Sequence, residues 1–318
     1  MTSPLRVGTF SPSILVRLAR ETGALSRHGL EVAEVPVPSS PAQFRSLRAG
    51  DLDVALTSPD NVLVYRFLAA NPIGGRLDVR IVLAVDRGLG LSLFGRAGID
   101  STAAVGGGVV GVDVSDSGFA YAGYELLARA GLRRDVDYRV VELGSTPGRL
   151  RSLLAGECDA TMLNAGNDLR AEDAGLNRLA RITGSSGPYL GTVLAAPGAA
   201  CQRRDQRIGA LVAALRQTGA ALLAGRHRDL AATLAAHASD MSPAAATRYV
   251  DTLVDPDEGL VPTGRVDSES LATVVGLRRR HQPHAPAGVS VGAGTDADST
   301  GTAESDPGLV DTAFLPDD

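Results

Sequence analysis

Lysine is absent from this chain of 318 residues, and all 31 of its basic side chains are arginines. A pyridoxal phosphate enzyme forms its Schiff base on a lysine amine, and a P-loop places a lysine on its phosphates. The sequence therefore excludes both classes. An anion bound by this protein must be held by arginine, by hydroxyl groups or by backbone N–H groups.

Cysteine and aromatic residues are scarce. Cys158 and Cys201 are the two cysteines, which allow one disulfide at most, and neither a CxxC motif nor a Cys/His cluster accompanies them. We therefore expect no metal site and no cofactor. Aromatic residues make up 4% of the chain and tryptophan is missing, which disfavours an aromatic cage for a quaternary ammonium.

Long apolar runs and clusters of positive charge are also missing. No run approaches the ~20 apolar residues that cross a bilayer, so we expect no membrane insertion. The net charge is −5, and seven acidic residues but no arginine lie in residues 281–318. The remainder is nearly neutral and lacks the basic surface of a nucleic-acid-binding protein. The Gly-, Ala-, Ser-, Pro- and Asp-rich composition of residues 281–318 predicts a disordered acidic tail.

An internal repeat is the main feature that is present. The stretch Arg-Ser-Leu-x-Ala-Gly-acid-x-Asp occupies residues 45–53 and returns at residues 151–159. The same order of apolar strand, polar loop and helix surrounds both copies. Alternating strands and helices predict an α/β fold with mostly parallel sheets, and two copies of one pattern predict two similar lobes.

Two crossover segments are expected to join these lobes, near residues 88–92 and 189–195. Lobe one would then consist of residues 1–88 plus 193–280, and lobe two of residues 89–192. In open α/β sheets, ligands bind outside the carboxyl ends of the strands. If the two lobes face each other, the loops that follow their strands line one shared cleft.

The second copy also carries a family resemblance. Gly111-Val112 with the Ser-rich loop that follows, a helix that ends at Ala130-Gly131-Leu132, and residues 154–160 resemble the aliphatic-sulfonate, nitrate and taurine binding proteins of ABC transporters. Residues 21–30 look like the family's segment before its second strand, and the likeness covers about residues 5–275. It implies the type 2 periplasmic-binding-protein architecture.

The resemblance implies a solute-binding protein that closes two lobes around a small polar or anionic ligand, with an ABC permease as partner. The alternative is a cytoplasmic enzyme on the same scaffold, a cofactor-independent lyase or decarboxylase acting on a small organic acid. The chain as written starts without a secretory signal pattern, which predicts a cytoplasmic location. A periplasmic or cell-surface location is expected if the start is misassigned.

The loops after the expected strands supply the candidate site residues. Hydroxyl, amide and backbone groups on these loops suit a small polar ligand. The candidate ligand-binding residues are Ser11, Ser13, Ser58, Asn61, Ser115, Ser117, Gly118, Asn164 and Asn167. For an enzyme, Asp60 and Asp168 are the candidates for proton transfer, although either can instead cap a helix. No histidine falls on an expected cleft loop, which argues against Ser-His-Asp catalysis.

Overall fold

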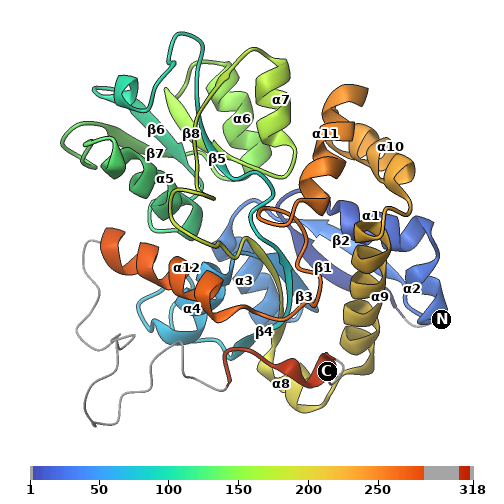
Figure 1. Cartoon of the computed structure of the whole chain (residues 1–318). Helices are drawn as coiled ribbons and strands as arrows, with labels where there is room; N and C mark the ends of the chain where they lie inside the picture. Colours follow the sequence, from blue (N-terminus) through green and yellow to red (C-terminus); the bar gives the residue numbers. More distant parts are fainter. Residues whose placement is uncertain (1–2, 283–307, 316–318) are drawn as a thin grey trace.

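A computed structural model of the chain describes residues 3–282 and 308–315, and it contains two five-stranded sheets (Figure 1). The first sheet has, in spatial order, the strands β2 (Val32–Pro36), β1 (Leu5–Thr9), β3 (Val54–Thr57), β10 (Thr192–Pro197) and β4 (Val79–Asp86). The second has β7 (Arg139–Glu142), β6 (Val109–Val112), β8 (Ala160–Leu163), β5 (Ser92–Gly95) and β9 (Asn177–Arg181). The predicted α/β fold with two similar lobes is confirmed.

The two sheets share one pattern of strand directions. In the first sheet β1 runs parallel to β2 and β3, whereas β10 runs antiparallel to β3 and β4. In the second sheet β6 runs parallel to β7 and β8, and β5 runs antiparallel to β8 and β9. The opposed strand of each sheet is the one that enters from the other lobe, because β5 follows the crossover after β4 and β10 follows the crossover after β9.

Helices cover both sheets (Figure 1). In the first lobe they are α1 (Ile14–Glu21), α2 (Ala24–Arg27), α3 (Ser40–Ala49), α4 (Pro59–Phe67), α8 (Gly198–Gln202), α9 (Gln206–Leu223), α10 (Arg228–Ser239) and α11 (Pro243–Val254). The second lobe has the 3₁₀ turn η1 (Ala103–Val105) and the helices α5 (Gly118–Arg129), α6 (Thr146–Leu154) and α7 (Asn167–Asp173). The last helix, α12 (Ser268–His281), packs against α4 of the first lobe and α5 of the second.

The repeated acid-x-Asp motif has one structural role in both lobes. Asp53 stands before β3, and its Oδ2 accepts a hydrogen bond from the backbone N–H of Arg6 in β1, at 2.8 Å. Asp159 stands before β8, and its Oδ2 accepts one from the N–H of Val109 in β6, at 2.7 Å. Each aspartate satisfies a backbone donor of the neighbouring interior strand, so the motif positions one strand on its neighbour.

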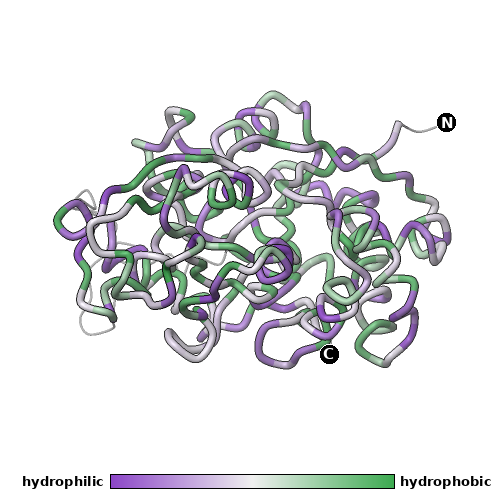
Figure 2. Tube along the Cα trace, turned by 90° about the horizontal axis from the view of Figure 1, so that it is seen from above, coloured by the Kyte–Doolittle hydropathy of each residue, from purple (hydrophilic) through white to green (hydrophobic). Residues whose placement is uncertain are grey.

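The apolar core continues from one lobe into the other. One cluster of buried side chains contains Phe44 of α3, Tyr121 of α5 and Leu271 of α12. A second cluster packs α9, α10 and α11 on the first sheet. Figure 2 shows apolar and polar residues interspersed along the drawn chain. Within the described residues, no single helix has both the length and the apolar character to cross a membrane; the strongly bent pair α9 and α10 meets those criteria only when both helices are counted together.

The prediction of a disordered tail over residues 281–318 is wrong for residues 308–315. Leu309 is 2% exposed, and Val310 forms a parallel β-bridge with Ile81 of β4. Asp311 pairs with Arg80 at 3.2 Å. A pair of apolar residues inside a polar segment is too weak a local signal to predict an ordered segment from the sequence. The segment is ordered because β4 offers it a free sheet edge. Residues 281 and 282 end α12, and the rest of the predicted tail lies outside the described residues.

Candidate ligand-binding site

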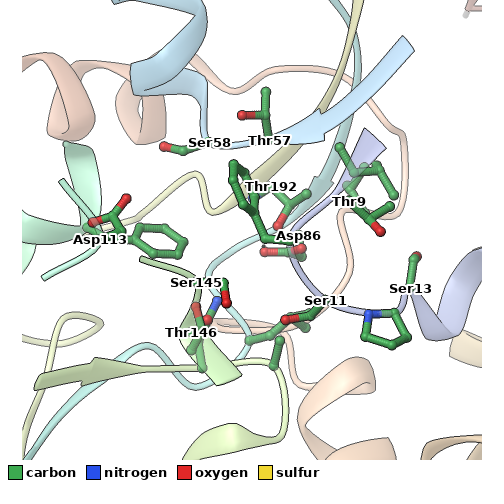
Figure 3. Close-up of a pocket in the computed structure, with 18 of the residues that line it drawn as sticks. Thr9, Ser11, Ser13, Thr57, Ser58, Asp86, Asp113, Ser145, Thr146 and Thr192 are labelled. Atoms are coloured by element: carbon green, nitrogen blue, oxygen red, sulfur yellow. Dashed lines mark hydrogen bonds between the residues drawn. The ribbon is translucent and has the colours of Figure 1, made fainter. Parts of the chain in front are cut away.

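A cavity of about 130 Å³ lies between the lobes, where the loops that follow their strands meet (Figure 3). Its lining comes from both sheets, as the labelled hydroxyl and carboxylate groups show. The loops after β1, β2 and β3 contribute from the first lobe, and those after β6, β7 and β8 from the second. The site therefore lies outside the carboxyl ends of the parallel strands, as the topology rule for such sheets requires.

Five helices begin at this cavity, and each begins at a serine. The N-cap residues of α1, α3, α4, α5 and α6 are Ser13, Ser39, Ser58, Ser117 and Ser145. The first four hydroxyls each accept a backbone N–H of their own helix, at 3.1–3.4 Å. Ser145 makes no side-chain cap bond. The positive ends of five helix dipoles therefore converge on one cavity, which favours a bound anion.

A buried arginine adds a full positive charge. Arg149 of α6 is 1% exposed and lines the cavity. Its guanidinium donates to the carbonyl oxygens of Gly144 (2.6 Å) and Met162 (3.1 Å) and to Thr146 Oγ1 (3.1 Å). Within residues 3–282 and 308–315 it has no carboxylate at ion-pair distance, and its Nε has no hydrogen-bond partner. Burial lowers the pKa of Arg149, but a guanidinium stays protonated in proteins.

The first copy of the repeat has a neutral residue at the position of Arg149. Gln43 occupies the equivalent place in α3, and its Nε2 donates to the carbonyl oxygens of Gly8 and Leu56, both at 3.1 Å. Leu56 and Met162 are equivalent in the two copies, so both side chains bond the same strand position. Sequence reasoning missed Arg149. The signal was available, because aligning the repeats upstream to Ser39 and Ser145 places an arginine opposite a glutamine.

Two carboxylates also line the cavity. Asp86 ends β4 and is 1% exposed; burial raises its pKa to about 6, despite hydrogen bonds from the residues around it. Asp113 follows β6, and its Oδ1 accepts the hydroxyl of Ser117 at 2.5 Å. Neither was predicted as a site residue. Asp86 ends an apolar strand pattern, and Asp113 stands in the loop whose serines and glycine were chosen instead.

Apolar side chains complete the lining. Leu15, Leu56, Val85, Leu89, Tyr249, Leu253 and Leu260 all face the cavity and all belong to the core cluster around α9, α10 and α11. Phe10 comes from the loop after β1, and Phe119 from the first turn of α5. The cavity therefore offers an apolar wall beside its polar helix starts, which suits a ligand with an organic body.

The structure brings most of the predicted ligand-binding residues to the cavity. The residues that line it are Ser11, Ser13, Ser58, Asn61, Ser117, Gly118 and Asn164. Ser115 and Asn167 do not. The backbone N–H of Ser115 donates to Glu142 at 2.8 Å, and Asn167 Nδ2 donates to the carbonyl oxygen of Asn164 at 3.1 Å.

The two candidates for proton transfer lie outside the lining. Asp60 is fully buried and accepts two hydrogen bonds from Arg278, at 2.5 and 2.7 Å. Asp168 accepts the N–H of Gly166 at 3.0 Å, and burial raises its pKa to about 7. Arg178 reaches Asp168 at 3.4 Å but lies closer to Glu172, at 2.8 Å, so it offsets the burial of Asp168 only weakly.

The sequence matches a family whose description fits this geometry. The model of a family described as "ABC transporter, phosphonate, periplasmic substrate-binding protein" matches residues 14–241. The chain belongs to this family. It is therefore a substrate-binding protein of the ABC-transporter type that this family model describes. Comparison of the sequence with curated proteins finds no match.

Several solved structures have a fold similar to that of this chain over most of its length. The alkanesulfonate-binding protein SsuA from Xanthomonas axonopodis pv. citri, bound to MOPS, aligns with a TM-score of 0.69 and 16% identity, covering 88% of this chain and 94% of that one. The aliphatic sulphonate binding protein SsuA from Escherichia coli gives 0.66 and 19%, covering 89% and 87%. A ligand-binding component of an ABC-type import system from Staphylococcus aureus gives 0.73 and 12%, covering 98% of both chains. At these identities the likeness shows the fold, and the expected type 2 periplasmic-binding architecture is confirmed.

Proposed function

We propose that the cavity binds a small organic oxyanion, a phosphonate or a sulfonate, which the protein delivers to an ABC permease. The observation that carries this is the convergence of five serine-capped helix starts and the buried Arg149 on one cavity. Backbone N–H groups, hydroxyls and a guanidinium are the donors that tetrahedral oxyanions accept. The lysine-free chain has no other full positive charge at this place in the described residues.

The apolar wall narrows the ligand class to anions with an organic body. An inorganic anion would leave Leu253, Leu260 and Tyr249 in contact with water inside the cavity. An alkyl or aryl group would instead remove their surfaces from water, at roughly 25 cal/mol per Å² of apolar area. The names of the similar structures, which include sulfonate-binding proteins, agree with this class.

Ligand capture would use the two crossovers as hinges. We assign residues 1–88 with 193–280 to one moving lobe and residues 89–192 to the other. Groups from both lobes line the cavity, so a bound anion is completely surrounded only when the lobes are closed. Delivery to a permease places the protein outside the cytoplasmic membrane, in line with the periplasmic family description.

Isothermal titration calorimetry on the purified, ligand-stripped protein tests the proposal. The panel contains an alkylphosphonate, an alkanesulfonate of the same chain length, inorganic phosphate and nitrate, with an uncharged dialkyl sulfone as control ligand. We expect the organic anions to bind at least tenfold tighter than the inorganic ones and the sulfone not to bind. Equal binding of nitrate and the organic anions, or binding of the sulfone, would contradict the proposal.

A further inference from the structure

Residues 308–315, here called the C-terminal segment, pair with the sheet of lobe one as an added strand. Ile81 of β4 donates its backbone N–H to the carbonyl oxygen of Leu309, at 2.9 Å, and its own carbonyl oxygen accepts the N–H of Asp311, at 2.8 Å. Val310 stands between these two residues and forms the parallel bridge with Ile81. This is the main-chain pattern by which a peptide from another molecule adds a strand to a free sheet edge.

Two buried leucines anchor the C-terminal segment. Leu309 is 2% exposed and belongs to the core cluster that joins the lobes, whereas Leu315 is 9% exposed and belongs to the cluster around α9, α10 and α11. Between them, the 3₁₀ turn η2 (Thr312–Phe314) packs on β4 and α9, and Figure 1 shows it near α8. Docking therefore removes apolar surface from water at both ends of a short peptide.

One ion pair makes the docking selective for charge. Arg80 Nη1 of β4 donates to Asp311 Oδ2 at 3.2 Å, and the two side chains are 19% and 14% exposed. Arg80 also pairs with Asp78 of its own lobe, at 3.3 Å. A pair this shielded from water is screened by salt less than a fully exposed pair. A segment with the opposite charge at position 311 would therefore fit this edge poorly.

The C-terminal segment completes the cover of β4. Near the end of that strand, Val261 donates its N–H to the carbonyl oxygen of Val85, at 2.9 Å, and Ala84 donates to the carbonyl oxygen of Gly264, at 2.8 Å. The C-terminal segment continues this cover at Ile81. Without it, this part of β4 would present unpaired backbone groups that attract a strand from another chain.

The covalent connection does not restrict the segment to its own chain. Residues 283–307 join α12 to the C-terminal segment, and a connection of 25 residues reaches at most roughly 85 Å. A folded chain of this size is roughly 50 Å across. The segment makes the same contacts on either copy, so concentration decides which copy it occupies. Linkers give a local concentration on the order of millimolar, which a concentrated solution of the protein can match.

We propose that the β4 edge of one copy binds the C-terminal segment of a second copy, and that two chains exchange these segments to form a dimer in concentrated solution. Exchange of an identical element costs little, because every contact of the monomer is kept in the dimer. The Arg80–Asp311 pair then joins two chains instead of the two ends of one. This inference does not depend on the ligand of the cavity.

Complementary charge reversals test the exchange. Arg80→Asp and Asp311→Arg each place like charges together within one chain, whereas a mixture of the two variants offers opposite charges between chains at both β4 edges. We expect the mixture, at about 100 μM of each, to sediment mostly as a dimer with one copy of each variant. Each variant alone should sediment as a monomer. The double variant Arg80→Asp/Asp311→Arg restores opposite charges within one chain, so it is the matched control and should also be monomeric.

Sedimentation of the unmodified chain completes the test. We expect a monomer at about 10 μM and at least a third of the chains in dimers at about 1 mM, whereas Asp311→Arg should stay monomeric at both concentrations. Circular dichroism checks that every variant is folded.

Three results would overturn the inference. A mixture of folded variants that stays monomeric would show that the segment docks only on its own chain. Dimers of either variant by itself would show association without complementary segments. An unmodified chain that stays monomeric at the higher concentration would show that its segments do not exchange.

Discussion

Arg278 and Asp60 form a buried ion pair where the two lobes meet. Two guanidinium nitrogens of Arg278 in α12 donate to the two carboxylate oxygens of Asp60 in α4, at 2.5 and 2.7 Å. The same guanidinium donates to the carbonyl oxygen of Asp116, at 3.0 Å, and lies 4.9 Å from the ring centroid of Tyr121. One side chain of α12 thus contacts both lobes, and it explains why Asp60 is not free for chemistry in the cavity.

Replacement of Arg278 tests the energetic role of this pair. Arg278→Met leaves the carboxylate of Asp60 buried without a cation, and we expect a loss of about 3–5 kcal/mol in the free energy of unfolding. The double variant Asp60→Asn/Arg278→Met should recover most of it, because no charge remains buried. Urea denaturation measures both values.

Arg279→Met is the matched control, since Arg279 is the exposed neighbour on the same helix and its replacement should change the free energy of unfolding by less than about 0.5 kcal/mol. A double variant as unstable as Arg278→Met would contradict this account.

The close approach of α5 to α4 gives a second prediction. A β-carbon at Gly118 would stand 2.6 Å from the β-carbon of Asp60 and 3.2 Å from Ser58 Oγ. Gly118→Ala should therefore hold the lobes apart and weaken ligand binding by about tenfold, which corresponds to ~1.4 kcal/mol. Small-angle scattering should show less compaction on adding ligand. Gly209→Ala is the control, because a β-carbon there makes only ordinary contact, 3.5 Å from Phe314. Unchanged affinity in Gly118→Ala would show that the contact does not govern closure.

Arg149→Gln tests the positive charge of the cavity with the residue that the first repeat uses. We expect oxyanion affinity to fall by about 10- to 100-fold, the effect of one charge-assisted hydrogen bond of roughly 1.5–3 kcal/mol. Thermal stability should not fall, because the variant removes a positive charge that burial disfavours in the folded protein. The control is Arg151→Gln, an exposed arginine of the same helix. Equal affinities for the two variants would rule out Arg149 as the ligand's counter-charge.

Asp86 should make stability depend on pH. Burial raises the pKa of Asp86 in the folded chain to about 6, above the value of about 4 for an unfolded aspartate. The folded state then holds the proton more tightly, so this residue lowers stability as pH rises from about 4 to about 6. Asp86→Asn should be more stable than the unmodified chain at pH 8, by about 3 kcal/mol, and equally stable at pH 4.

Urea denaturation at pH 4, 6 and 8 measures this difference between variant and unmodified chain. Asp100→Asn, at an exposed carboxylate, serves as the control and should follow the unmodified chain at every pH. A constant difference between Asp86→Asn and the unmodified chain would mean that the Asp86 carboxyl does not titrate between pH 4 and 8.

The sequence by itself determined the two-lobed architecture and the general position of the site. Repeated strand–loop–helix patterns are local signals, because apolar periodicity and helix caps act over a few residues. The same pattern places serines in the loops after the strands, so the sequence alone predicts Ser13, Ser58 and Ser117 at the cleft. The Arg-Ser-Leu-x-Ala-Gly-acid-x-Asp motif also revealed the repeat, and its aspartates turn out to join neighbouring strands.

Only the tertiary structure decided which polar groups face the cavity and which form hydrogen bonds or ion pairs with other residues of the protein. Asp60 pairs with Arg278, 218 residues away, and Asp86 accepts the N–H of Thr192, 106 residues away, besides that of nearby Gly88. No local pattern encodes such distant pairs, because electrostatic and hydrogen-bond partners depend on where whole elements pack. For the same reason Arg149, which no local pattern singles out, becomes the buried positive charge that lines the cavity.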